Sequence, residues 1–155
     1  MERAPLAPEL QSLDSEAIAA FATELGTLLS RNFNVDCGWL FGSVARGEAG
    51  PLSDVDIAVL LTLDVAPEER MNVTVSLYED LERRCGRVDL VLLEEASSLL
   101  KHRVLRDGIL LLERDETRRV KFEARAIQEY LDFQYYADIY DRALLARARE
   151  GRLGL

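Results

Sequence analysis

The amino-acid sequence predicts an α/β (α+β) fold in which helices flank one small mixed β-sheet and a long helix ends the chain. The apolar pattern changes along the chain in the order helix, strand, strand, helix, strand, helix, strand, helix. The 155 residues contain no internal repeat and no long linker. We therefore expect a single domain over residues 1–155, with a loose arm at residues 1–8 and a helical extension at residues 115–150.

The first half of the chain supplies one helix and two strands. Apolar residues recur at helical spacing over residues 8–31. Residues 35–41 are predicted to form a strand, and a glycine-rich loop follows over residues 42–53. Residues 54–62 should form the second strand, because the run Ile-Ala-Val-Leu-Leu is apolar enough to be buried on both faces.

The second half alternates helices with strands. Pro67 suits the first turn of a helix, and Gly86 would end that helix after Cys85. The remaining elements are expected in this order: a strand at 87–93, a helix at 96–107, a strand at 109–113 and a long helix at 117–149.

Composition and charge narrow the classes of function. The net charge of −9 provides no electrostatic footprint for DNA or RNA, so direct nucleic-acid binding is not expected, although a single nucleotide remains possible. The first residues lack a signal-peptide pattern, and no apolar run is long enough to span a membrane. Cys37 and Cys85 lack metal-binding spacing. A cytoplasmic protein without membrane contact is therefore expected.

Three aspartates are the candidate chemical groups. Asp54 and Asp56 lie two residues apart at the start of a strand, so their side chains point to the same face and Val55 to the other. Asp89 occupies a comparable place in the third strand. If the two strands are neighbours in the right register, the three carboxylates converge.

Converging carboxylates need a positive charge, because like charges raise each other's pKa. Mg²⁺ prefers oxygen ligands and is often shared between carboxylates and a nucleotide's phosphates. Two such ions about 4 Å apart activate an attacking oxygen and neutralise the leaving one. Gly42 and Ser43 suit the same chemistry, because a residue without a side chain lets phosphate oxygens approach backbone N–H groups.

Each feature also has an ordinary structural explanation. An Asp-x-Asp step often belongs to a surface turn, Asp89 could simply pair with Arg87, and Gly-Ser is a common loop dipeptide. The combination is rarer: a strand, Gly-Ser, ten residues, Asp-x-Asp opening an apolar strand, then a helix and a strand with one Asp. This combination favours a functional site.

The stretch GSVARGEAGPLSDVDIAVLL at residues 42–61 resembles the Gly-Ser-x-Ala-Arg-Gly…Ser-Asp-x-Asp signature of the minimal nucleotidyltransferases. These proteins form a branch of the DNA polymerase β-like nucleotidyltransferase superfamily. The resemblance is strongest to the MNT antitoxins that are paired with HEPN toxins, and it covers about residues 35–93. The later stretch FEARAIQEYLDFQYY is similar to the tail of these antitoxins, but less specifically.

The resemblance implies a nucleotidyltransferase fold and an activity. Such proteins transfer AMP from ATP to a tyrosine hydroxyl of the cognate HEPN toxin and thereby silence its ribonuclease activity. The implied site residues are Gly42 and Ser43 for the triphosphate, Asp54 and Asp56 for Mg²⁺, and Asp89 as the third carboxylate, which activates the acceptor. Arg46 matches the arginine of the motif, and either phosphate contact or an ion pair that supports the loop would explain it.

Two other functions remain open. A non-catalytic antitoxin could act by binding and occlusion alone, although pure binding would not need the intact Gly-Ser and carboxylate set. A small-molecule (antibiotic) nucleotidyltransferase is less favoured, because its acidic acceptor pocket normally requires more chain.

The last predicted helix carries a continuous apolar stripe, formed by Phe122, Ala126, Tyr130, Phe133, Ala137, Tyr140 and Leu144. The stripe could cover the sheet as ordinary core or dock a partner. Tyr135 and Tyr136 broaden it, and aromatic enrichment is typical of interfaces. Both uses remain open for different segments of the stripe, and the resemblance implies that a docked partner would be the cognate toxin.

Overall fold

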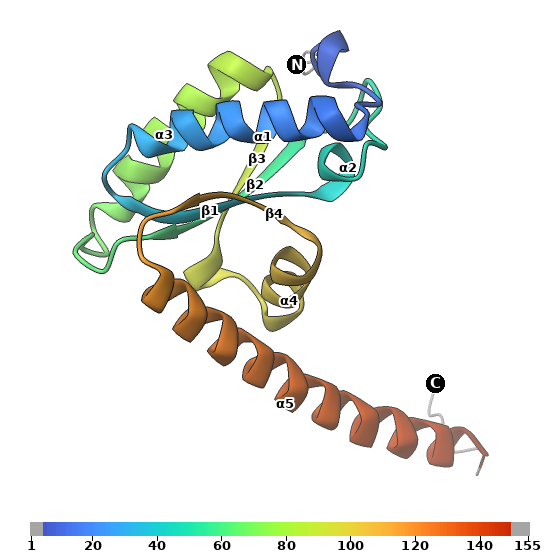
Figure 1. The fold of residues 1–155 in the computed structure, drawn as a ribbon. Helices are drawn as coiled ribbons and strands as arrows, with labels where there is room; N and C mark the ends of the chain where they lie inside the picture. The colour runs from blue at the N-terminus through green and yellow to red at the C-terminus, as the bar shows by residue number, and fades with distance from the viewer. Residues whose placement is uncertain (1–4, 150–155) are drawn as a thin grey trace.

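A sheet of four strands with helices on both faces forms the body of the protein, in a computed structural model that describes residues 5–149 (Figure 1). In chain order the elements are η1 (Pro8–Leu10), α1 (Ser15–Ser30), β1 (Val35–Phe41), α2 (Gly42–Ala45), β2 (Val55–Leu61), α3 (Arg70–Cys85), β3 (Val88–Leu92), η2 (Leu93–Glu95), α4 (Ser98–Asp107), β4 (Ile109–Glu113) and α5 (Glu116–Arg149).

The sheet is mixed, as predicted. Its strand order is β3-β2-β1-β4, with β1 antiparallel to both β2 and β4, and β2 parallel to β3. The apolar run of β2 lies in the middle of the sheet and is buried on both faces, as its sequence indicates.

Alternate residues of the strands serve two cores. Helices α1 and α3 cover one face, and α4 with the first part of α5 covers the other (Figure 1). The core under α1 and α3 includes Leu25, Ile57, Val59, Leu77 and Leu81. The core under α4 includes Cys37, Trp39, Ala58, Leu60 and Val104.

Helix boundaries differ from the predictions where local capping decides them. The predicted helix at 8–31 is divided into η1 and α1, because Ser12 takes a positive φ of 51° and the Asp14 side chain caps α1 by accepting from the Ala17 N–H at 2.8 Å. Helix α3 begins three residues after Pro67 and ends, as predicted, at Gly86 with φ 79°. The glycine-rich loop contains the short helix α2, which was not predicted.

The N-terminal arm is packed in the part that is described. Leu6 is fully buried, and its N–H donates to the Pro51 carbonyl at 2.9 Å. The prediction of a loose arm is therefore wrong from Leu6 onward, because this leucine joins the core under α1. Residues 1–4 of the predicted arm lie outside the described residues.

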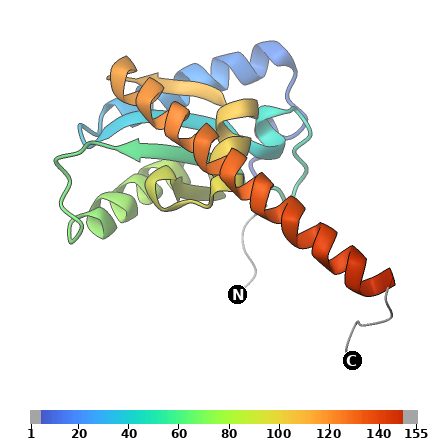
Figure 2. The same ribbon diagram turned by 90° about the horizontal axis from the view of Figure 1, so that it is seen from below.

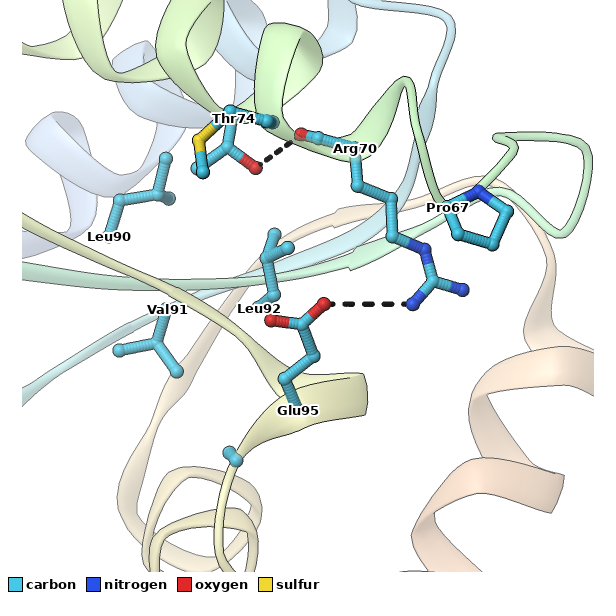
Figure 3. Close-up of a pocket in the computed structure, with 9 residues that line it drawn as sticks. Pro67, Arg70, Thr74, Leu90, Val91, Leu92 and Glu95 are labelled. Atoms are coloured by element: carbon cyan, nitrogen blue, oxygen red, sulfur yellow. Dashed lines mark hydrogen bonds and ion pairs between the residues drawn. The ribbon is translucent and has the colours of Figure 1, made fainter.

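Strand β3 forms one edge of the sheet and is less buried than β2. Figure 3 shows Leu90 and Leu92 of this strand beneath α3, with Val91 on the opposite face. A cavity of about 460 Å³ follows the strand between α3 and η2.

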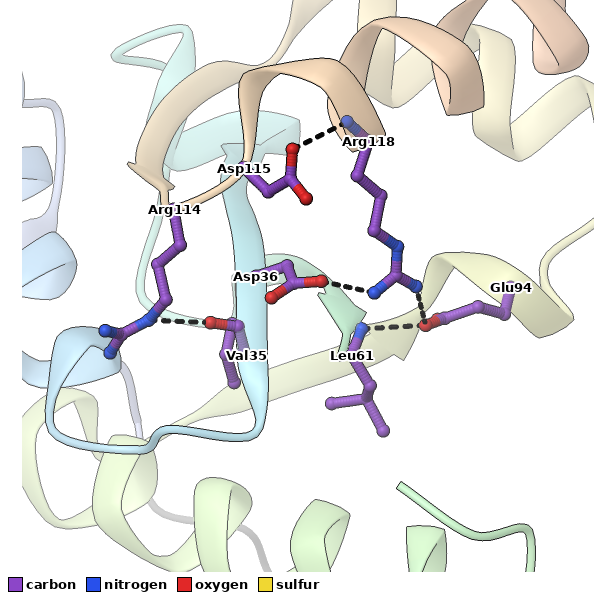
Figure 4. A network of polar contacts seen from close by, with 7 residues as sticks. All are labelled: Val35, Asp36, Leu61, Glu94, Arg114, Asp115 and Arg118. Atoms are coloured by element: carbon purple, nitrogen blue, oxygen red, sulfur yellow. Dashed lines mark hydrogen bonds and ion pairs between the residues drawn. The ribbon is translucent and has the colours of Figure 1, made fainter. Parts of the chain in front are cut away.

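Helix α5 is anchored at its start by a polar network (Figure 4). Arg118 pairs with Asp36 of β1 and lies 3.7 Å from Glu94, which accepts from the Leu61 N–H at 2.7 Å. Arg114 donates to the Val35 carbonyl at 2.9 Å. These contacts fix the first turn of α5 to the ends of β1 and β2.

Beyond this anchor, α5 crosses the α4 side of the sheet and continues past the body of the molecule (Figure 2). Phe122 packs on the core under α4, Ala126 is buried, and Tyr130 stacks on His102 with ring centroids 3.7 Å apart. Farther along, Phe133 is 49% exposed and Tyr140 65% exposed. The first part of the apolar stripe is therefore core, and the second part is uncovered. No helix within residues 5–149 combines the length and apolar character needed to cross a membrane.

Candidate active site

The parallel pairing of β2 and β3 aligns two of the three predicted carboxylates. Asp56 and Asp89 are register partners, and residues opposite each other on paired strands project to the same face. Asp56 belongs to the alternating set that includes Ala58 and Leu60, so both carboxylates face the α4 side of the sheet. The convergence predicted for these two residues is present in the structure.

Asp56 is held where its charge is disfavoured. Burial raises the pKa of Asp56 to about 6, and the nearby charges of Asp89 and Asp54 act in the same direction. Arg46 opposes this rise. A cation bound at this point would therefore stabilise the charged form of the Asp56 carboxylate.

Asp54 has a partner that the sequence did not assign to it. The Arg87 Nε lies 2.6 Å from Asp54 Oδ1, and the two side chains are 14% and 31% exposed. The sequence allowed Arg87 to pair with Asp89, its near neighbour in the chain, but β3 brings Arg87 to Asp54 instead. Asp54 is thus neutralised by an arginine, whereas Asp56 is not.

The Gly-Ser turn lies directly beside Asp56. Phe41 is the register partner of Asp56, and the chain turns into α2 at the next residue. Gly42 has φ 72°, and a Cβ added there would overlap the Asp56 carboxylate. Glycine is required here for both reasons. Ser43 follows in α2, where its carbonyl accepts from the Glu48 N–H at 2.9 Å.

Arg46 has a contact that fits support of the loop. Its Nε lies 2.8 Å from Glu48 Oε2, and the two side chains are 53% and 64% exposed. Such an exposed pair contributes little to stability. The charge of Arg46 also opposes the rise in the pKa of Asp56.

The carboxylates of β2 and β3 offer oxygen donors for a metal ion. Within residues 5–149, no group of three or more His, Cys, Asp and Glu side chains is arranged to hold one. Asp56 and Asp89 supply the oxygen donors that Mg²⁺ prefers, and the unneutralised charge of Asp56 suits a cation. A third carboxylate ligand would require Asp54 to turn away from Arg87.

The cysteines take no part in this site. Burial raises the pKa of Cys37 to about 11 and that of Cys85 to about 12, so both remain protonated thiols at neutral pH.

Comparison with known proteins extends these observations. The family model described as polymerase beta, nucleotidyltransferase matches residues 23–117. The structure is similar to a chain of a toxin–antitoxin complex with AMP-PNP, at 26% identity and a TM-score of 0.61, with coverage of 80% of this chain and 98% of that one. A mutant complex containing MntA gives 25% identity, a TM-score of 0.62 and the same coverages.

A third structure shares the fold. It contains a tri-AMPylated HEPN toxin from Shewanella oneidensis in complex with an MNT antitoxin, and it matches at 22% identity and a TM-score of 0.57. This match covers 83% of this chain and 98% of the other. No curated protein sequence matches.

Proposed function

The chain belongs to the polymerase beta nucleotidyltransferase family, and on this premise we propose that it is an antitoxin that transfers AMP from ATP to a hydroxyl of a cognate HEPN toxin. The observation that carries the proposal is the alignment of Asp56 with Asp89 beside the Gly42 turn. The similar structures with AMP-PNP and with MntA are toxin–antitoxin complexes, which supports both ATP and a toxin as partners.

The transfer is a substitution at phosphorus. The acceptor oxygen forms a bond to the α-phosphorus of ATP, the bond from that phosphorus to the pyrophosphate oxygen breaks, and the hydroxyl proton leaves. Asp89 is exposed on the edge strand, so it is accessible to an incoming acceptor. We assign it the role of accepting the proton. The products are an AMP ester on the acceptor and pyrophosphate.

Asp54, Asp56 and Asp89 are the residues that would hold Mg²⁺, with a two-ion arrangement expected. When bound, Mg²⁺ supplies the positive charge that neutralises the phosphates and activates the attacking oxygen. Asp56 is ready for this role because nothing else compensates its charge fully. Asp54 would have to exchange Arg87 for the metal.

Gly42, Ser43 and Arg46 are the residues proposed to hold the triphosphate. The first N–H groups of a helix have no partner within the helix, and α2 begins at Gly42 next to the carboxylates. Arg46 would have to leave Glu48 to contact a phosphate, and the exposure of this pair makes the exchange inexpensive.

The uncovered part of α5 is the proposed docking surface for the toxin. Both views show this part of the helix leaving the body on the side where α2 lies (Figures 1 and 2). Its aromatic residues include Phe133, Tyr135, Tyr136 and Tyr140, which are 49% to 69% exposed. Aromatic residues are enriched in interfaces, and a protein bound here would stand next to the nucleotide site.

A co-expression experiment tests transfer against occlusion. The toxin is expressed with the wild-type chain, with the Asp54→Asn, Asp56→Asn double variant, or with Asp64→Asn as a control at an exposed aspartate in the loop after β2. Mass spectrometry of the toxin should show added AMP with the wild type and the control and none with the double variant. Full neutralisation of the toxin by the double variant, without added AMP, would establish occlusion instead.

A further inference from the structure

Strand β3 presents a free backbone edge. In a parallel pair, alternate residues turn both backbone groups toward the neighbouring strand. The Val55 N–H donates to the Arg87 carbonyl at 2.9 Å, so Arg87 and Asp89 face β2 and Leu90 faces outward. Within residues 5–149, no group hydrogen-bonds the backbone N–H or C=O of Leu90 on this outer side. The strand also lacks the Lys or Pro that often protects an edge.

The opposite edge of the sheet, strand β4, is partly covered by a helix. Helix α1 packs directly on β4, and a Cβ added at Gly26 would overlap the Leu111 carbonyl oxygen. A cavity of about 510 Å³ nevertheless remains between α1 and β4. The β3 edge is the accessible edge that is aligned with the carboxylates.

A groove follows the accessible edge. The cavity of about 460 Å³ is lined by Leu90 and Leu92 from β3 and by Met71 and Thr74 from α3 (Figure 3). Met71 is 71% exposed there. The ion pair of Arg70 with Glu95, at 3.6 Å, lies at one end. Side chains that project toward α3 from an added strand would enter an apolar groove.

A strand paired with β3 would place one of its residues opposite Asp89, which is itself aligned with Asp56. Residues opposite each other on neighbouring strands share a face of the sheet, with Cβ atoms about 4.5–5.5 Å apart. A residue placed opposite Asp89 would therefore project to the face that carries Asp89 and Asp56. Its two neighbours in the added strand would project the other way, toward Leu90 and the groove.

From this alignment we propose that the acceptor protein presents its hydroxyl residue on an extended segment that pairs with β3 as a fifth strand. The segment carries a tyrosine opposite Asp89 and apolar residues next to it. Backbone hydrogen bonds from Leu90 supply the pairing, and the groove selects the neighbouring side chains. This inference rests on the proposed transfer of AMP to a protein hydroxyl, and it names how the acceptor is recognised.

Variants of the full chain provide the first test. The probe is a ten-residue peptide of alternating Val and Thr with one central Tyr, offered with ATP and Mg²⁺. Leu90→Pro removes the outward N–H but none that faces β2, and Met71→Glu places a charge in the groove. Leu90→Pro should reduce transfer to the peptide by up to about tenfold, as expected for the loss of one backbone hydrogen bond. Met71→Glu should reduce transfer to a similar extent, because the bound peptide would bury an unpaired charge in the groove. Leu63→Glu, at an 83% exposed leucine outside the groove, should change nothing.

Modified peptides test the same backbone pairing without changing the protein, so the result does not depend on whether the proline variant folds. The first modified peptide is N-methylated at the two residues that flank the tyrosine. The second is N-methylated at the tyrosine and at the residues two positions before and after it. Only one of these sets faces β3, so one copy should lose transfer and the other should retain it. The inference would be overturned if all three peptides received AMP equally. It would also be overturned if Met71→Glu and the wild type transferred AMP to the unmodified peptide equally.

Hydrogen exchange separates this inference from the proposed function. The unmodified peptide should slow exchange of the Leu90 amide even without ATP, because pairing does not require transfer. Slowed exchange without any AMP transfer would refute the proposed chemistry and retain the strand addition. Transfer without any change at Leu90 would retain the chemistry and refute the strand addition.

Discussion

At the scale of single residues, the carboxylate of Asp56 is held in surroundings that disfavour its charge. Its pKa is raised to about 6 from 3.8, first by burial and then by Asp89 and Asp54. When folding raises the pKa of a group, its contribution to stability is complete at pH values below the pKa of the unfolded state. The contribution is lost as the pH rises through the pKa of the folded state. For Asp56 the relevant window runs from about pH 4 to about pH 6.

The first prediction is that Asp56→Asn stabilises the protein at high pH in the absence of divalent cations. An amide does not ionise, so the variant avoids the cost that the wild type acquires between about pH 4 and pH 6 and carries in full above pH 6. The free energy of unfolding of the variant, relative to wild type, should rise by about 1–3 kcal/mol between pH 4.5 and pH 8. Urea unfolding in EDTA measures it, with Asp64→Asn as control. A difference independent of pH would contradict the assigned burial of Asp56.

The second prediction concerns the arginine that neutralises Asp54. Arg87→Gln leaves a partly buried carboxylate without its counter-charge, which should cost about 1–3 kcal/mol of stability. Because Arg87 would no longer compete for Asp54, added Mg²⁺ should raise the melting temperature more for the variant than for wild type. Arg83→Gln removes an exposed pair with Asp80 and serves as the control. Equal stabilisation of wild type and Arg87→Gln by Mg²⁺ would show that Asp54 takes no part in metal binding.

At the scale of elements, the strands were the best predicted parts. Residues 35–41 and 109–113 were placed without error, because apolar runs between polar turns mark strands clearly. The division between η1 and α1 was missed because the leucine spacing continues through Leu10 and Leu13 across the break. The pairing of Arg87 with Asp54 was also missed, since it depends on the register of two strands separated by α3. Periodicity could show the stripe on α5 but not which part another element covers.

The third prediction separates the two parts of that stripe. Phe133→Ala and Tyr140→Ala alter exposed side chains, so each should change the free energy of unfolding by less than about 0.5 kcal/mol. Each should nevertheless weaken toxin binding, by about 2 kcal/mol where the residue is a hot spot. Tyr130→Ala removes the stack on His102 and should lower the melting temperature instead. Parallel melts and titrations with the toxin provide both readouts, and unchanged toxin affinity in both exposed variants would move the docking surface elsewhere.

At the scale of the whole molecule, the proposed nucleotide site and the uncovered part of α5 are structurally independent. Both cores are complete by Ala126, and no described residue beyond it is buried. The anchor at Arg118 fixes the helix to the sheet through its first turn, so the later turns add little to the stability of the body. The body would supply the chemistry, and the later turns would bring the acceptor to it.

The last prediction follows from this division. A chain truncated after Asp132 keeps the Tyr130 stack and both cores, so its melting temperature should stay within a few degrees of the full chain. Its affinity for Mg-ATP should be unchanged, because the carboxylates, the Gly42 turn and Arg46 all remain. Toxin neutralisation in cells should be lost, because the docking surface is absent. Calorimetry with ATP and a toxin growth assay measure these outcomes. Loss of ATP binding in the truncated chain would instead place the end of α5 in the nucleotide site itself.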